Sequence, residues 1–399
     1  MKISVLLSVL TAWAAVCSPA PWCRAQEGAA ASAEATPLRR GWSENFSSRL
    51  NAVGYARYLD ILDTPVNPGN IRAIPAWTYA LEARPDLGWT TERLRLQVKP
   101  RAEITHRVWG QGWRDGDSET DGDAHVNGWL AQVRLADALF ASYGREDLQW
   151  GPAYLVSSSN PFSQENGRHD PYLEQPGMDY AKVVVIPDSR FTATLIANTD
   201  PGRNDGFQEF RKTYALKIDY TVENFFAALI PSVREGSRPS IGAYAGWHPS
   251  DALLLYAESR YADETEKIST LAGATYTFKD GTALSGEYYH NGEGNADESI
   301  LSAVGKRVGG NPGETSPYFR KHYLLLQAVK SRIWDRVHLT ARWMANLDDD
   351  SSRLLGLAEW EFSDRAVLFV VGNRFCGDAD TEFGSLFEWS GMAGMSFTY

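Results

Sequence analysis

The chain has 399 residues, 43% of them hydrophobic and 12% aromatic, and a formal net charge of -11. No segment after residue 26 approaches the roughly twenty consecutive apolar residues of a transmembrane helix, so a mature chain that spans a membrane must do so as a closed sheet. The acidic balance gives no reason to expect a nucleic-acid partner. The sequence holds neither a phosphate-binding loop nor a Cys/His metal cluster, and no cofactor is expected.

The N-terminal segment predicts export. Lys2 precedes an apolar run over residues 3–17, and Ala25 offers a small residue at a cleavage point, so residues 1–25 are interpreted as a signal peptide. Cleavage leaves Cys376 without an intrachain cysteine partner, so no disulfide is expected. Residues 26–48, Ala-rich at first, are expected to form a disordered leader, and residues 49–399 a single domain.

The rest of the chain shows period-2 stretches bounded by turn residues, which predict strands. We expect strands near 50–61, 74–85, 91–107, 127–136, 138–148, 179–187, 190–197, 209–220, 223–230, 239–248, 251–260, 268–278, 282–290, 319–331, 334–346, 352–362, 366–374 and 388–398. Short connections, such as 136–138 and 187–189, alternate with longer ones, as in transmembrane barrels with both termini in the periplasm. The predicted fold is all-β, a closed antiparallel transmembrane β-barrel of about eighteen strands. Sixteen strands remain possible if residues 50–85 form a plug or a periplasmic segment.

The expected strand 91–107 carries a basic row on one face. A cation that faces lipid at the membrane midplane costs about 2–4 kcal/mol, so this row must face the lumen. The basic row is Arg93, Arg95, Lys99 and Arg101, and neighbouring strands extend it with Arg134 and Arg145. The expected opposite wall carries Glu258, Glu287, Glu359 and Glu361. Such a transverse field would favour anionic or strongly dipolar solutes, unless these charges only pair with one another across the wall.

The third outer connection, from about residue 150 to residue 178, is long and rich in Pro and Gly, which favours a folded loop. Its Trp150-Gly151, Asn160-Pro161 and Pro176-Gly177 pairs, together with Gly144-Arg145 before them, resemble segments of alginate-export-type and related substrate-selective porins. The resemblance implies that this loop folds inward and narrows a channel. The candidate constriction residues are then Glu165, Arg168, His169, Asp170 and Glu174. An outward cap is the alternative.

The last strand alternates large or apolar residues with small or polar ones and ends at Tyr399. This ending resembles that of autonomous outer-membrane barrels, which typically close on a C-terminal aromatic that the assembly machinery reads. The resemblance implies the outer membrane of a Gram-negative bacterium. The expected partners are outer-membrane lipid and lipopolysaccharide, the barrel assembly machinery, and small anionic or polar solutes or a polysaccharide.

Two other kinds of site have partial signatures in the sequence. The acidic stretch around Asp117, Glu119 and Asp121 has oxygen ligands that suit Ca²⁺, but no Glu stands at the twelfth position of an EF-hand frame. His290 faintly resembles the histidine of outer-membrane phospholipases, but no Ser-Asn-Gly follows it, and no enzyme is expected. The sequence therefore predicts a channel for passive, charge-selective passage of small anionic or polar solutes. The alternatives are an alginate-like exopolysaccharide export pore and a plugged structural or adhesive barrel.

Overall fold

The computed structural model describes residues 45–399 except 166, 204–209, 297–298 and 309–315. The predicted signal peptide and nearly all of the predicted leader lie outside the described residues. Within the described part of the chain, no helix is long and apolar enough to cross a membrane.

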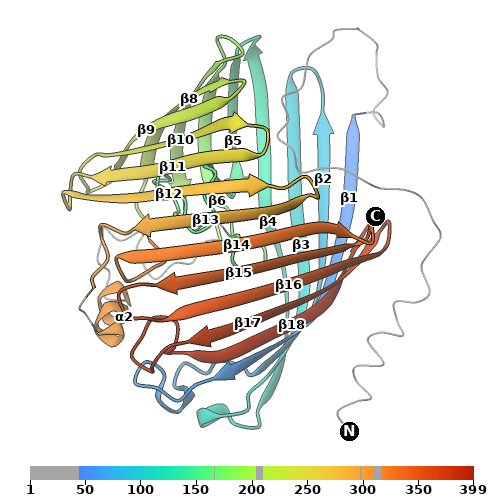
Figure 1. Ribbon diagram of the computed structural model, residues 1–399. Coiled ribbons are helices and arrows are strands. Elements are labelled where there is room, and N and C mark those ends of the chain that lie inside the picture. The colour runs from blue at the N-terminus through green and yellow to red at the C-terminus, as the bar shows by residue number, and fades with distance from the viewer. Residues whose placement is uncertain (1–44, 166, 204–209, 297–298, 309–315) are drawn as a thin grey trace.

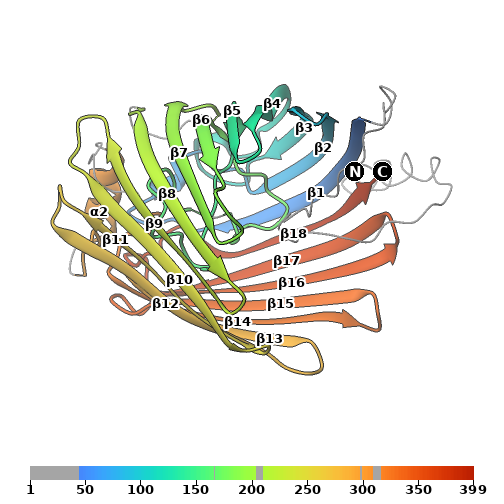
Figure 2. The same ribbon diagram turned by 90° about the horizontal axis from the view of Figure 1, so that it is seen from above.

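The described chain forms one antiparallel sheet of eighteen strands, as predicted. Each strand pairs with its neighbours in sequence, and β1 also pairs with β18, so the sheet closes on itself (Figures 1 and 2). The strands are β1 Phe46–Ile61, β2 Trp77–Thr90, β3 Leu94–Val108, β4 Ser118–Ala136, β5 Leu139–Glu146, β6 Met178–Val185, β7 Phe191–Asp200, β8 Thr213–Val222, β9 Phe225–Arg234, β10 Ser240–Ser250, β11 Leu253–Ala262, β12 Lys267–Thr277, β13 Thr282–His290, β14 His322–Ile333, β15 Val337–Asn346, β16 Ser352–Ser363, β17 Ala366–Cys376 and β18 Phe387–Thr398. Closure leaves no free sheet edge at the ends of the strand order, which a membrane-spanning sheet requires.

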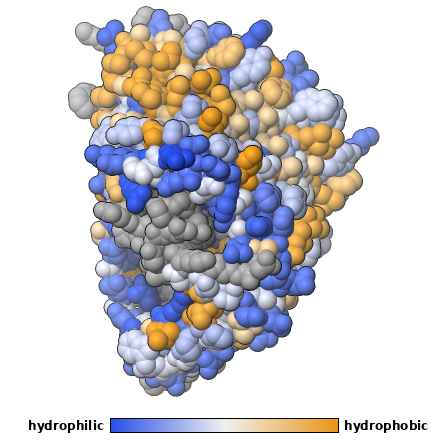
Figure 3. All heavy atoms as spheres, turned by 90° about the vertical axis from the view of Figure 1, so that its left-hand side faces the viewer, coloured by the Kyte–Doolittle hydropathy of each residue, from blue (hydrophilic) through white to orange (hydrophobic). Residues whose placement is uncertain are grey.

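The two faces of the wall differ in polarity because side chains alternate along each strand. Exposed apolar residues point outward on many strands, among them Leu195, Leu229, Ile241, Leu326 and Val370. The Tyr58 ring contacts Trp77 and Trp389 on this outer face, with ring centroids 4.8 and 4.7 Å away. Figure 3 shows hydrophobic side chains gathered over the upper part of one side of the molecule and mainly hydrophilic ones below. This outer surface is suited to contact with lipid, with aromatic residues at a membrane interface.

Several strand boundaries differ from the sequence-based expectation, among them the starts of β1 and β4. Strand β1 begins at Phe46, inside the segment assigned to the leader, because Phe46 still pairs with Trp89 of β2. Strand β4 begins at Ser118 instead of 127, because its ladder with β3 continues to the pair Val108 and Ser118. Since β1 and β2 both belong to the sheet, the sixteen-strand alternative is wrong.

The connections alternate between the two ends of the wall. The longest outer connections are the third loop, residues 147–177, and residues 291–321, which include the helix α2 Ile300–Val308. All connections of more than five residues lie at the outer end, as expected, while the outer connections 235–239, 263–266 and 347–351 are short turns.

This architecture predicts a specific electrophoretic behaviour. In detergent, the folded protein should give a β-rich circular dichroism spectrum and should migrate differently on SDS gels before and after boiling, because a closed hydrogen-bonded sheet resists SDS until it is heated. A helix-dominated spectrum would contradict the fold.

Candidate functional site

The third loop lies inside the wall and follows its inner face (Figures 1 and 2). Trp150 and Phe162 pack against Tyr180 of β6, Ile196 of β7 and Ile230 of β9. Between them, the segment of Ala153, Leu155 and Val156 packs against buried side chains of β11 to β15. Near the end of the loop, Tyr172 packs against residues of β1, β16, β17 and β18. The loop therefore contacts the inner face of the wall around most of its circumference.

Two buried glutamates of the wall hold the first half of the third loop. Glu287 of β13 accepts hydrogen bonds from the backbone N–H groups of Tyr154 and Leu155, at 2.6 and 2.8 Å, and from the Tyr256 hydroxyl at 2.6 Å. Glu258 of β11 accepts from the Ala153 N–H at 3.2 Å and from the Ser159 hydroxyl at 3.0 Å. Each glutamate is 1% exposed. The expectation that these two carboxylates line an open pore is therefore corrected: they face inward, but the loop covers them.

Arginines of β15 and β16 hold the middle of the third loop. The Arg342 guanidinium donates to the Arg168 carbonyl at 2.6 Å and to Nδ1 of His169 at 3.2 Å, and Nε2 of His169 donates to the Leu155 carbonyl at 2.8 Å. Burial, followed by the positive charge of Arg342, lowers the pKa of His169 to about 4. The imidazole is therefore neutral at physiological pH and acts as donor and acceptor at once. Arg353 forms an ion pair with Asp170 at 2.9 Å.

The end of the third loop lies against β16, β17 and β2. The Tyr172 ring stacks on Phe369 of β17 with centroids 3.6 Å apart, and its hydroxyl donates to Glu359 of β16. The Tyr172 carbonyl accepts a hydrogen bond from Arg84 of β2 at 2.8 Å. One loop residue thus contacts strands on both sides of β1 and β18, where the first and last strands meet.

Arg101, a member of the basic row on β3, also binds the end of the third loop. Its Nε and Nη2 donate to the two carboxylate oxygens of Glu174 at 2.6 and 2.8 Å, and Nη2 also donates to Asp86 at 3.0 Å. Although burial acts the other way, the hydrogen bonds from Arg101 lower the pKa of Glu174. Arg101 is 7% exposed. Arg101 therefore binds the loop and is not open to the lumen, which corrects the expectation for Arg101.

The other members of the basic row are more exposed. Arg95 and Lys99 lie on the inward face of β3, and Arg93 lies in the preceding turn. Within the described residues, neither Arg95 nor Lys99 has a carboxylate within ion-pair distance. Arg134 faces inward in phase with Gln132, the partner of Arg95, and forms an exposed ion pair with Asp137 at 3.0 Å.

The prediction for Arg145 is wrong. Arg145 pairs in register with Trp129, and both lie on the outward face with the exposed Tyr143. Its guanidinium binds Asp179 of β6, with 2.7 Å between Nε and Oδ1. The β4–β5 turn brings Arg134 opposite Phe140, so inward positions on β5 carry even numbers.

Four of the candidate constriction residues are exposed on the loop, among them Glu174, which binds Arg101. Glu165 and Asp170 contribute carboxylates, and Arg168, which also donates to the Ala153 carbonyl at 2.5 Å, contributes a cation. On the wall, Glu361 is exposed and lies 3.1 Å from Nε2 of His338. The loop surface therefore carries charges of both signs.

The acidic stretch does not form a Ca²⁺ cage. Glu119 and Asp121 stand two residues apart on β4, Asp117 and Glu119 both bind Arg114, and Asp121 accepts from the Gly122 N–H. Within the described part of the chain, no group of three or more His, Cys, Asp or Glu residues is arranged to hold a metal ion.

The similarity to solved proteins is one of structure. OccK5 (OpdH) of Pseudomonas aeruginosa aligns with a TM-score of 0.57 and 11% identity over 90% of this chain and 99% of that one. OccAB3 of Acinetobacter baumannii aligns with a TM-score of 0.58 and 10% identity over 89% and 99% of the two chains. A mutant porin of Rhodopseudomonas blastica aligns with a TM-score of 0.48 and 14% identity over 89% and 100%. No protein-family model and no curated protein sequence matches the chain.

The chain has the fold of outer-membrane porins. In this porin fold, the sequence-based reasoning missed four residues that hold the third loop. Arg84, Arg342 and Arg353 occupy inward positions of strands that were predicted, so the same alternation could have identified them. Tyr172 carried no such signal, because its stacking on Phe369 depends on how the loop crosses the interior.

Proposed function

We propose that the protein is a channel of the outer membrane through which small anionic or polar solutes cross passively. The observation that carries the proposal is the third loop, which charged side chains of β2, β3, β11, β13, β15 and β16 hold against the inner wall of a closed barrel. Buried charges are costly unless they are paired, so an arrangement that uses so many of them fixes the shape of the interior. A loop that is held in one position narrows the channel to a constant width.

Charge selectivity is proposed from the cations that the loop leaves uncovered. Arg95 and Lys99 are exposed on the inward face of β3, whereas Glu258 and Glu287 of the facing wall are covered. This removes two negative charges from the passage while the positive charges stay in contact with water. A solute that passes β3 would then meet a local excess of positive charge, which favours anions.

The proposed location and partners follow from the outer face of the wall. Its exposed apolar and aromatic side chains suit outer-membrane lipid and lipopolysaccharide of a Gram-negative bacterium. Tyr399 closes the ladder of β18 by exchanging backbone hydrogen bonds of 2.8 Å with Leu50, and we propose that this aromatic end is read by the barrel assembly machinery.

Planar lipid bilayers test the proposal. The purified protein should insert as discrete, long-lived conductance steps, and its reversal potential in a salt gradient should indicate anion preference. A barrel that inserts without conducting would support a plugged structural role, and passage of a polysaccharide but not of small ions would support export.

A further inference from the structure

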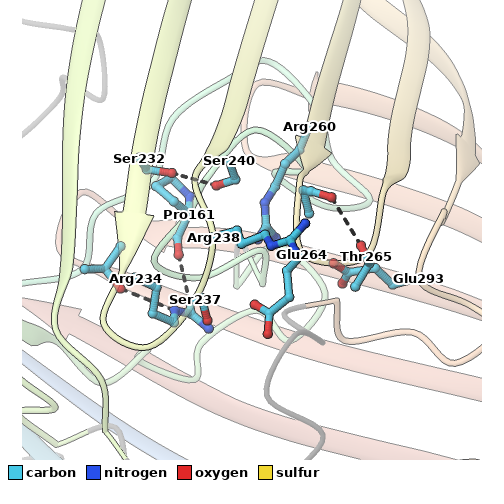
Figure 4. A pocket seen from close by; sticks show the side chains of 12 residues that line it. Pro161, Ser232, Arg234, Ser237, Arg238, Ser240, Arg260, Glu264, Thr265 and Glu293 are labelled. Carbon is cyan, nitrogen blue, oxygen red and sulfur yellow. Dashed lines mark hydrogen bonds between the residues drawn. The ribbon is translucent and has the colours of Figure 1, made fainter.

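A small polar cavity lies on the inner face at the outer ends of β8 to β11, away from the basic row (Figure 4). About 30 Å³ of it is open to the centres of water-sized atoms. One water needs about 10–15 Å³ by this measure, so the cavity has room for a few waters or one small oxyanion. Side chains of Arg234, Arg238 and Arg260 line it, together with the carboxylates of Glu264 and Glu293. Arg238 also forms an ion pair with Asp263, at 3.8 Å, outside the lining. The capacity of the cavity to bind an anion therefore depends on Arg234.

Arg234 is a charge held by neutral partners. Its Nε donates to the Thr213 hydroxyl at 3.3 Å and its Nη2 donates to the Pro161 carbonyl at 2.9 Å. Among the described residues, no carboxylate lies within ion-pair distance of this guanidinium. A cation that is partly removed from water and lacks a counter-charge is unfavourable. Arg234 therefore has the capacity to bind an anion.

A second polar group in the cavity also lacks a partner. The Ser237 hydroxyl is buried and has no hydrogen-bond partner, although the Ser237 N–H donates to the Arg234 carbonyl at 2.9 Å. Buried hydroxyls normally have a partner, so an unsatisfied one beside a cavity indicates a place for a ligand or a water. The Ser237 hydroxyl lies on the turn directly after β9, which ends at Arg234.

We propose that this cavity binds a phosphate-type oxyanion, free or as part of a solute. A guanidinium presents parallel N–H donors that match two oxygens of such an anion, and a serine hydroxyl can donate to a third. Because Pro161 of the third loop accepts from Arg234, the bound anion would lie beside the loop at the outer entrance. The site would specify a class of solute for the proposed channel. It rests on the proposed function, because solutes must reach the outer entrance of the channel.

The test is a titration of the full chain in detergent with inorganic phosphate, followed by the ³¹P NMR linewidth. Saturable broadening is expected, and Arg234→Gln should weaken binding by about tenfold, the loss expected for a charge-assisted hydrogen bond. Ser237→Ala should weaken it by a smaller factor, and Arg234→Lys should retain part of it. Arg190→Gln, which removes an equal charge from an exposed short turn at the opposite end of the barrel, should leave binding unchanged. Heat-modifiable migration on gels verifies that each variant is folded.

Several results would overturn the proposal. These are wild-type binding by a folded Arg234→Gln variant, loss of binding in Arg190→Gln, and displacement of phosphate by an equal concentration of acetate. If bilayers show an anion-selective channel but phosphate does not bind, this site is wrong and the proposed function stands. If phosphate binds through Arg234 in a barrel that does not conduct, the site stands without the proposed function.

Discussion

Replacing Glu258 and Glu287 together by alanine should raise the single-channel conductance and broaden its distribution. The two carboxylates accept hydrogen bonds from the backbone of residues 153–155 and from Ser159. Hydrogen bonds to charged groups contribute about 1.5–3 kcal/mol each, so losing them should favour detachment of the loop by about 3 kcal/mol or more, at least a hundredfold in population. A detached loop no longer has a fixed position, and the passage should fluctuate in width.

The measurement is a histogram of conductance steps in planar bilayers. Glu361→Ala is the matched control, because Glu361 is a glutamate of the same inner face that contacts His338 and not the loop. Each single glutamate variant should show an intermediate effect. An unchanged histogram in a heat-modifiable double variant would mean that apolar packing alone holds the loop, and that the buried carboxylates do not control the passage.

Reversing the charge of Arg95 and Lys99 to glutamate should shift the reversal potential toward cation preference. Both side chains are exposed on the inward face of β3, about 13–14 Å apart along the strand at two residues per 6.6–6.8 Å. Folding should be unaffected, because each side chain is already solvated. The shift should decrease at high salt, since the Debye length falls from about 10 Å at 0.1 M to about 3 Å at 1 M.

The control for this experiment changes the same total charge elsewhere. Arg190 and Lys279 are exposed residues of the short turns at the opposite end from the third loop, and reversing both to glutamate should alter the selectivity little. If the variant of Arg95 and Lys99 keeps its anion preference at low salt, or if the turn variant loses it equally, the basic row does not set selectivity.

The sequence predicted the wall well because its signal is local. Alternation within single strands and turn residues between them sufficed to identify eighteen strands and the inward direction of Arg95, Lys99, Glu258 and Glu287. The wrong direction for Arg145 arose because a strand's phase depends on its pairing across the preceding turn. Strand β4 was predicted too short because a bulge interrupts its alternation opposite Lys99 and Pro100.

The contacts of the third loop could not be predicted in the same way. Which wall residue the loop covers depends on its path through three dimensions, and the partners are far apart in sequence, as with Tyr154 and Glu287 or Arg168 and Arg342. Alternation identifies a side chain that faces inward. It does not tell whether that side chain meets water or another part of the chain, and this distinction separates Lys99 from Arg101.

Tyr172 has a consequence for how the two ends of the chain stay joined. Its ring stacks on Phe369 of β17 and its carbonyl binds Arg84 of β2, so the residue bridges the two strands that flank the β1–β18 pair. The contacts of Tyr172 inside the barrel therefore stabilise the junction at which β1 and β18 close it. A force that separates β1 from β18 must also break the contacts of Tyr172. The third loop, which narrows the channel, therefore also makes the barrel more resistant to mechanical opening.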